Sequence, residues 1–302
     1  MNVFLAGGSG AIGVPLVRML VADGHQVTAL TRSSANATML RGLGATPAIA
    51  DALDAEALRR VVVAAHPTHV IHELTALPKG GPKSVGDLDA TNRLRIEGTR
   101  NLIAAAVAAG ATRLIGGSFA LIGASKPGVP PDMQPAADAV HSMESQILDA
   151  SRSGAIEGIV LRYGLFYGPE NPSTVQMISV VRRRWMPIIR GDQGLLPYIH
   201  VDDAARATIA ALDHAPAGST YDIVDNRAVS ASEFLQTIAE LAGAPRPFAI
   251  PSWLLRLVAP YMMRMIELRL PLSNAKARAD LGWSLLFPTV REGLMQTLRH
   301  VT

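Results

Sequence analysis

The 302-residue sequence predicts an α/β fold in which helices cover both faces of a doubly wound parallel sheet. The first observation behind this prediction is that short apolar runs of strand length alternate with segments of helical periodicity over residues 1–163. The second is the composition, because 49% hydrophobic and 18% charged residues fit a globular chain with a sizeable core. The length allows one large domain, alone or with a smaller attachment.

Six apolar runs are predicted to be strands of this sheet. They are Met1–Ala6, Gln26–Leu30, Thr46–Ala50, His69–Glu73, Arg113–Gly117 and Ile156–Tyr163. The helices predicted between them are Val14–Ala22, Ala37–Leu43, Ala55–Ala65, Leu88–Ala109 and Ala137–Ser151. Asp54 is well placed to cap the third of these helices. A stretch rich in Pro and Gly over residues 124–135 predicts a loop.

The first predicted strand runs directly into the glycine-rich segment Gly7–Gly13, and a helix follows. A strand, a glycine turn and a helix N-terminus together present free backbone N–H groups to a pyrophosphate. Gly7 permits a tight turn, Gly10 lets the backbone approach a phosphate, and Gly13 allows the helix to pack closely. The other interpretation is a tight turn with no ligand. The position of the motif after an N-terminal strand favours dinucleotide binding.

The second predicted strand ends just before Arg32 and Ser33, where a dinucleotide fold meets the adenosine ribose. An acidic residue there would accept hydrogen bonds from a free 2′-hydroxyl, whereas an arginine with serine hydroxyls suits a 2′-phosphate. NADP is therefore predicted over NAD, the alternative being that Arg32 is an ordinary surface residue. Asp51 has two open roles, contact with the adenine amino group or support of a turn. The residues predicted to contact the cofactor are Gly7, Ser9, Gly10, Ala11, Ile12, Gly13, Arg32, Ser33, Asp51, Ala52, Leu74, Thr75 and Ala76.

Composition narrows the classes of partner. The net charge of +3 implies no broad surface for nucleic acid, and the basic run Arg182–Arg184 is typical of a solvated helix face. There is no cysteine, which excludes disulfides and thiolate chemistry and suits a reducing compartment. No signal peptide and no apolar stretch of membrane-spanning length stands out. We expect a cytoplasmic protein that binds a small molecule, with no nucleic-acid partner, no membrane partner and no metal site.

Several motifs resemble, in their order along the chain, those of one enzyme family. Besides Gly7–Gly13 they are Gly98–Leu102, Leu161–Pro169, Tyr198–Ala205, Tyr221–Asn226, Leu281–Trp283 and Arg291–Leu294. Together they resemble the extended short-chain dehydrogenase/reductase superfamily, in its NAD-dependent epimerase/dehydratase branch. The resemblance implies a Rossmann domain over residues 1–168, to which residues 198–224 return. It also implies a smaller, mainly helical substrate domain over 169–197 and 225–302, and a homodimer formed through the long helices.

The chain departs from this resemblance at the proton-transfer site. Family enzymes carry a Tyr-x-x-x-Lys pair, in which the lysine lowers the pKa of the tyrosine. Counting back from Arg162 puts Val140 at the lysine position and Ala136 at the tyrosine position. Neither apolar residue can move a proton, so the sequence predicts that the pair is absent. Shifting the register to His141 keeps a titratable group but loses the match of Glu144 to a family glutamate.

Three side chains are candidates to take over the catalysis. Ser118 matches the family's strand-end serine, which hydrogen-bonds a substrate oxygen, and its other interpretation is a turn residue. Tyr163 lies near the expected nicotinamide, although a core aromatic is the more frequent role of such a residue. His141 is titratable, although an exposed position on its helix is more typical. His200 is expected to be structural, because the two aspartates after it begin a helix.

We expect an NADP-dependent oxidoreductase that acts on a small, fairly apolar carbonyl compound, alcohol or enone, with an atypical proton-transfer site. The alternative is a catalytically silent NAD(P)-binding sensor. A nucleotide-sugar epimerase or dehydratase is disfavoured by Ala136, Val140 and Leu165, the last standing where many such enzymes have a substrate-binding asparagine. The apolar run Trp253–Met263 is typical of packed helix core, and its alternative roles are a pocket lid or a membrane-surface helix.

Overall fold

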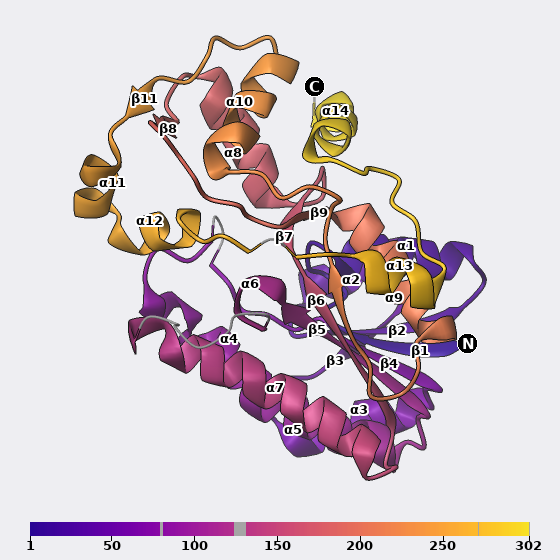
Figure 1. The fold of residues 1–302 in the computed structure, drawn as a ribbon. Helices are drawn as coiled ribbons and strands as arrows, with labels where there is room; N and C mark the ends of the chain where they lie inside the picture. Colours follow the sequence, from indigo (N-terminus) through magenta and orange to yellow (C-terminus); the bar gives the residue numbers. More distant parts are fainter. Residues whose placement is uncertain (79–80, 124–130, 271, 302) are drawn as a thin grey trace.

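The computed structural model describes residues 1–78, 81–123, 131–270 and 272–301. Within them, seven strands form one parallel sheet in the order β10-β6-β5-β4-β1-β2-β3 (Figure 1). The strands are β1 (Asn2–Ala6), β2 (Gln26–Thr31), β3 (Thr46–Ile49), β4 (His69–His72), β5 (Arg113–Phe119), β6 (Glu157–Tyr163) and β10 (Thr220–Ile223). The predicted doubly wound α/β fold is confirmed. The order of strands reverses between β1 and β4, which defines the switch point of the sheet.

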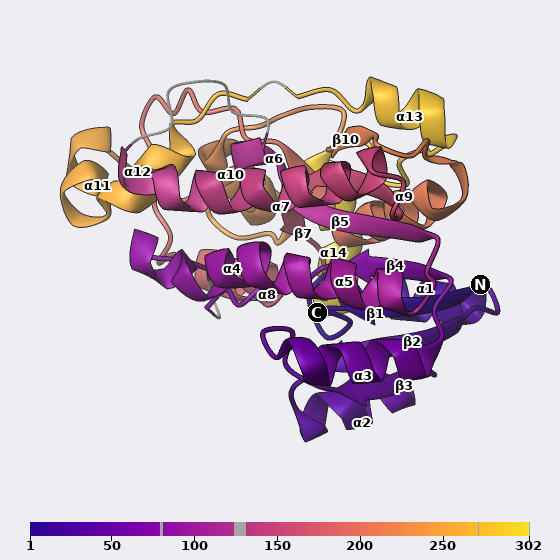
Figure 2. The same ribbon diagram turned by 90° about the horizontal axis from the view of Figure 1, so that it is seen from below.

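Helices cover the sheet on both faces. One face carries α1 (Gly13–Ala22), α2 (Ser34–Gly42), α9 (Val201–His214) and α13 (Ala275–Leu281). The other face carries α3 (Ala55–Ala65), α5 (Thr99–Ala108) and α7 (Gln134–Arg152), which run side by side across Figure 2. Side chains of β1 alternate between the two faces, since Val3 and Leu5 join one apolar cluster and Phe4 and Ala6 join the other. This burial on both faces explains why the strand is apolar throughout.

The long helix predicted over Leu88–Ala109 is present but irregular. A 3₁₀ turn, η1 (Val85–Leu88), leads into α4 (Asp89–Arg93), and a π-helical turn, η2 (Leu94–Gly98), separates α4 from α5. Such π-helical turns are rare and are frequent at functional sites. The side chains of η2 are therefore candidates for a functional role.

Only part of the loop predicted over residues 124–135 can be placed, because residues 124–130 lie outside the described residues. The short helix α6 (Ala120–Gly123) precedes them. Pro131–Met133 form a 3₁₀ turn, η3, and α7 begins directly after it. The helix before β6 therefore starts earlier than the sequence predicts.

The remaining elements lie beyond the sheet, in the upper part of Figure 1. They include two short two-stranded sheets. In one, β7 (Leu165–Tyr167) pairs with β9 (Tyr198–His200), and in the other β8 (Ile188–Ile189) pairs with β11 (Ala249–Ile250). The helices are α8 (Pro172–Arg182), α10 (Ala231–Leu241) and α14 (Val290–Val301). They pack around Tyr167 and Phe234, whose rings meet edge to face, in what we call the C-terminal cluster.

The apolar run Trp253–Met263 forms packed core only at its end, where Met263 is buried. It makes two short helices, α11 (Ser252–Val258) and α12 (Pro260–Ile266). No residue of α11 is buried, and Trp253 and Leu257 are 64% and 74% exposed. The core interpretation is therefore wrong for α11, because this helix of two turns lies at the periphery, where the described elements leave all of its side chains at least partly exposed.

Candidate active site

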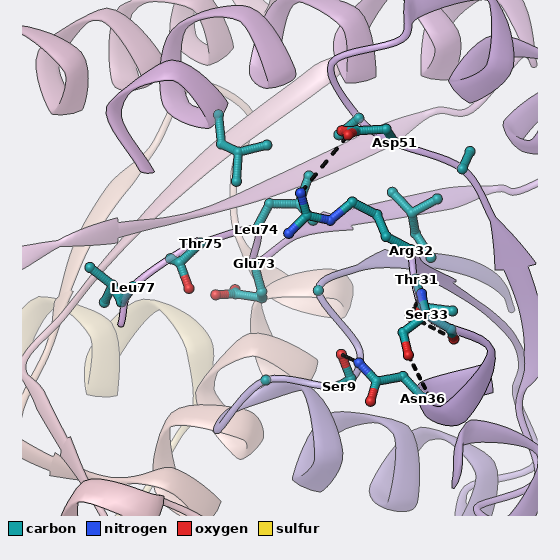
Figure 3. A pocket seen from close by; sticks show the side chains of 16 residues that line it. Ser9, Thr31, Arg32, Ser33, Asn36, Asp51, Glu73, Leu74, Thr75 and Leu77 are labelled. Atoms are coloured by element: carbon teal, nitrogen blue, oxygen red, sulfur yellow. Dashed lines mark hydrogen bonds and ion pairs between the residues drawn. The ribbon is translucent and has the colours of Figure 1, made fainter. Parts of the chain in front are cut away.

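A cavity of about 660 Å³ opens at the carboxyl ends of β1, β2, β3 and β4 (Figure 3). Its lining includes these predicted cofactor residues: Gly7, Ser9, Gly10, Arg32, Ser33, Asp51, Ala52, Leu74 and Thr75. The place where the strand order of an open α/β sheet reverses is where such proteins bind their ligands. One wall of the cavity is thus formed by the segments that follow β1, β2, β3 and β4, although these segments are far apart in the sequence.

Close contacts explain two of the glycines in the turn after β1. Gly7 has a φ of +106°, and a Cβ there would lie 2.5 Å from the carbonyl oxygen of Glu73. A Cβ on Gly13 would overlap the carbonyl oxygen of Gly7. Gly10 donates its N–H to the same oxygen at 3.0 Å. The turn is tight and carries little side chain, and the N-terminus of α1, the positive end of the helix dipole, lies directly behind it.

Four of the predicted cofactor residues do not line the cavity. Ala11, Ile12 and Gly13 lie behind its wall, where Ile12 and Gly13 are buried. Ala76 lies further along, and its N–H donates to Oγ1 of Thr91 at 3.0 Å. These residues shape the wall through the backbone and through packing.

Arg32 and Asp51 face each other at one end of the cavity. Nη1 of Arg32 lies 3.9 Å from Oδ2 of Asp51, and the two side chains are 62% and 43% exposed. Asp51 also accepts the N–H of Leu53 at 3.0 Å, so it supports the turn after β3. An exposed ion pair at this distance holds the guanidinium only weakly. Arg32 is therefore free to bind another anion.

The first turn of α2 adds polar groups beside Arg32. Ser33 caps this helix by accepting the N–H of Asn36 at 3.4 Å. The side-chain amide of Asn36 donates to Oγ of Ser9 at 3.2 Å, which joins α2 to the glycine turn (Figure 3). Asn36 is not among the residues predicted from the sequence, because the predicted helix begins one residue later, at Ala37. A serine followed by helix-forming residues is the signal that would have placed the cap.

Glu73 is a second cavity residue that is not among the site residues predicted from the sequence. It directly follows β4, lines the cavity, and packs on Gly117 of β5, where a Cβ would overlap its carboxyl group. The hydroxyl of Tyr163 donates to Oε1 of Glu73 at 3.0 Å and shares a second hydrogen bond of 2.7 Å with Thr208. Desolvation raises the pKa of Glu73 to about 8, although the hydrogen bond from Tyr163 acts in the opposite direction. The carboxyl group is therefore mostly protonated at neutral pH.

Tyr163 reaches the cavity only through Glu73. It belongs to the apolar cluster between the sheet and α9, and only 3% of it is exposed. Burial raises the pKa of Tyr163 well above its usual value, and the neighbouring Glu73 acts in the same direction. The phenol is thus a fixed neutral hydrogen-bond donor, and it does not ionise near neutral pH.

The other two catalytic candidates do not line the cavity. Ser118 is buried and donates to Oε1 of Glu144 at 2.5 Å. Arg162 holds the same carboxylate through two hydrogen bonds of 2.9 and 2.6 Å. His141 is exposed on α7. The hydroxyl of Ser118 therefore already has a strong acceptor.

Apolar side chains surround the positions that correspond to the tyrosine and lysine of the family pair. Ala136 and Val140 are fully buried on α7, in an apolar cluster with Leu88 and Ile122. Glu144, one turn beyond Val140, is the first acidic group that follows on this side of α7.

The part of the chain that the structure describes contains no group of three or more His, Cys, Asp or Glu side chains placed to hold a metal ion. None of the described helices combines the length and the apolar character needed to cross a membrane.

Comparison with known proteins agrees with this geometry. A sequence profile described as the NAD dependent epimerase/dehydratase family matches residues 3–224, from β1 to the residue after β10. The chain belongs to the NAD-dependent epimerase/dehydratase family. The resemblance expected from its motifs is thereby confirmed.

Relatives of this family member include named reductases. It is 34% identical to the 3-diazoavenalumate denitrifying reductase of a Streptomyces species, over 97% of this chain and 99% of the relative. It is 26% identical to the 2-alkyl-3-oxoalkanoate reductase of Stenotrophomonas maltophilia, over 82% of this chain and 77% of the relative. The UDP-glucose 4-epimerase of Thermus thermophilus, solved with NAD, has the same fold with a TM-score of 0.80 at 24% identity, over 100% of this chain and 99% of that one. The protein is an NAD(P)-dependent oxidoreductase.

The residues of the cavity fit a dinucleotide of this kind. The glycine turn offers a concave backbone surface that a Cβ on Gly7 or Gly13 would disrupt. The N-terminus of α1 behind the turn favours negative charge, which suits a pyrophosphate. Gly7, Ser9 and Gly10 are thus the residues placed to hold it.

Proposed function

We propose that this protein is an NADP-dependent reductase of small, fairly apolar ketones, aldehydes or enones. The observation that carries the proposal is a single cavity lined by the glycine turn, by Arg32 and by a protonated Glu73. When bound, the reduced cofactor supplies the hydride. The chain itself must bind the cofactor, orient the substrate and supply a proton.

The choice of NADP rests on the polar groups around Arg32. Its guanidinium is largely exposed and weakly held by Asp51, so it is available to a 2′-phosphate. The N-terminus of α2, with Ser33 as its cap, adds N–H groups next to it. The residue after β2 is this arginine, where an acid would be needed for a free ribose 2′-hydroxyl.

The proton source in this proposal is Glu73. A carboxyl group with a pKa of about 8 is protonated at neutral pH and close enough to neutrality to give up its proton. The hydrogen bond from Tyr163, itself linked to Thr208, fixes the orientation of the carboxyl group. Tyr163 is then a positioning residue. Ser118, bonded to Glu144, holds the end of β5 to the middle of α7.

The substrate class rests on the relatives and on the lack of polar groups around Ala136 and Val140. The relative from Stenotrophomonas maltophilia is named for a 2-alkyl-3-oxoalkanoate, a ketone with apolar chains. A reductase of similar carbonyl compounds is consistent with an apolar surface where the family's proton-transfer pair would stand.

The proposal is tested by thermal shift and by turnover. NADPH is expected to raise the melting temperature more than NADH at equal concentration, and oxidation of NADPH is expected with members of a panel of apolar ketones, aldehydes and enones. Glu73→Gln should lower kcat by about 100-fold, the usual contribution of a general acid, and leave NADPH binding intact. Glu56→Gln, an exposed glutamate on α3, is the matched control.

Three results would count against parts of this proposal. Equal thermal shifts for the two cofactors would contradict the preference for NADP. Tight NADPH binding without turnover of any panel member would favour a catalytically silent sensor. Unchanged turnover in Glu73→Gln would remove Glu73 from the reaction.

A further inference from the structure

Arg95 is a buried cation without a counter-ion among the described residues. Only 8% of its surface is exposed, and its guanidinium makes no hydrogen bond or ion pair with the side chains or backbone of the described residues. Exposed arginines of the same helix differ, since Arg93 pairs with Glu97 through hydrogen bonds of 3.0 and 3.2 Å. An unpaired guanidinium inside a protein costs several kcal/mol, so its retention calls for a ligand or a partner of opposite charge.

The titratable groups that act on Arg95 carry no negative charge at neutral pH. His72, at the end of β4, has its pKa lowered to about 4 by burial and by the charge of Arg95, and it is therefore neutral. Nε2 of His72 is already hydrogen-bonded to Oγ1 of Thr99 at 2.8 Å. Tyr261 of α12 is the other neighbour, and burial raises the pKa of its phenol. The charge of Arg95 is left without compensation.

The position of Arg95 in the fold indicates that the missing counter-ion is supplied by the substrate. It is the second residue of the π-helical turn η2, and Leu94 just before it lines the cofactor cavity. Its neighbours are the carboxyl end of β4 on one side and α12 on the other. Arg95 itself is not part of the cavity lining; it follows a lining residue and lies between His72 at the end of β4 and Tyr261 of α12. This is the region in which a substrate must lie to meet a cofactor bound along the strand ends.

We propose that Arg95 binds a carboxylate of the substrate, so that the enzyme prefers carbonyl compounds that also carry an acid group. The inference rests on the proposed function and adds to it the substrate class. A planar guanidinium matches a carboxylate through two parallel hydrogen bonds. One buried positive charge balances one carboxylate, whereas a phosphate dianion would leave an excess of negative charge.

The test compares an acid with its ester. The probes are 4-acetylbenzoate and methyl 4-acetylbenzoate, which share the ketone and the ring and differ in charge. The wild type is expected to reduce the acid with a kcat/KM about 10- to 100-fold higher than that of the ester, the range that a charge-assisted hydrogen bond supplies. Arg95→Met should abolish this preference by losing activity on the acid only. Arg93→Met, an exposed arginine of the same helix, should retain it.

Stability and cofactor binding separate this role from a structural one. Arg95→Met is expected to melt no lower than the wild type without substrate, because the change removes an unpaired buried charge. It should also bind NADPH with unchanged affinity. A lower melting temperature with an unchanged preference for the acid would overturn the proposal, and so would a loss of NADPH affinity with that preference retained.

A binding measurement distinguishes failure of this inference from failure of the proposed function. Benzoate and benzamide are titrated calorimetrically into the enzyme saturated with NADP. Benzoate binding that is lost in Arg95→Met, without turnover of either ketone, would support the carboxylate site and contradict the reductase. Equal turnover of acid and ester would support the reductase and contradict the site. Absence of both turnover and benzoate binding would contradict both.

Discussion

At the scale of single residues, the cavity is distinguished by a carboxyl group that the fold keeps protonated. Glu73 is held between the turn at Gly7 and the backbone of Gly117, and its hydrogen-bond donor is Tyr163. The surroundings raise its pKa from 4.5 to about 8. In the proposed reaction, this protonated acid takes the role of the tyrosine–lysine pair, which the sequence predicts to be absent.

The pKa of Glu73 predicts how stability depends on pH. The folded state binds its proton up to about pH 8, whereas the unfolded chain releases it near 4.5, so the free energy of unfolding falls between these values. Glu73→Gln removes this dependence, and its free energy of unfolding should rise relative to that of the wild type by up to about 5 kcal/mol as the pH rises through this window. Urea denaturation over a pH series measures the difference. If the free energies of unfolding of the wild type and the variant differed by the same amount at every pH, the pKa of Glu73 would not be raised.

At the scale of elements, the turn between β1 and α1 depends on close backbone packing. Gly13 begins α1, and the space where its Cβ would stand is filled by the backbone of Gly7 and Gly8. Gly42 ends α2, and no atom lies within 4 Å of a Cβ added there. Gly13 is therefore a position where no larger residue fits, whereas at Gly42 glycine only lowers the stability of the helix.

A pair of alanine substitutions tests this difference. Gly13→Ala should destabilise the protein by about 2–4 kcal/mol and weaken NADPH binding, because the turn must open to admit the methyl group. Gly42→Ala should be neutral or stabilising by up to about 1 kcal/mol, since alanine is the better helix former. Thermal melts with and without NADPH measure both effects. Similar losses in the two variants would argue against the packing explanation.

At the scale of the whole molecule, α9 joins the sheet to the segment that leads to α14. Its apolar side chains pack on the sheet, while Asp203 in its first turn accepts the N–H groups of Leu286 and Phe287 at 2.7 and 2.9 Å. Asp203 is fully buried. His200 caps this helix by accepting the N–H of Asp202 at 3.2 Å, as expected for a structural histidine. One helix thereby fixes the C-terminal cluster relative to the cavity.

Removal of the carboxylate at Asp203 should loosen this connection. Asp203→Ala removes a fully buried acceptor from two N–H groups, those of Leu286 and Phe287, and we expect a loss of about 2–4 kcal/mol in the free energy of unfolding. Asp213→Ala, an exposed position on the same helix, should change stability by less than about 0.5 kcal/mol. Urea denaturation followed by circular dichroism gives both values. Equal stability of the two variants would contradict the role of Asp203.

Much of the fold was predictable because its causes are local. Apolar runs between turns identified the six strands that precede residue 164, and Asp54 caps α3 through a hydrogen bond of 2.9 Å to the N–H of Ala57, as its position indicates. The glycine spacing identified the turn after β1. Arg32 and Asp51 could be assigned to one ligand edge because the carboxyl ends of parallel strands meet there.

Other features depend on contacts between residues far apart in the chain. Tyr163 meets Glu73 across 90 positions of sequence, and no periodicity or motif records that encounter. The exposure of Trp253 was also beyond prediction, because an apolar run does not specify whether a neighbour covers it.

The sequence by itself determined the family, the parallel sheet and the cavity edge that suits a dinucleotide, since these follow from strand-length apolar runs, turn glycines and motif order. Only the tertiary structure decided which charges are buried. Burial raises the pKa of Glu73, and the Arg95 guanidinium has no counter-ion among the described residues, because the free energy of a charge depends on the water and the counter-ions that folding removes from it.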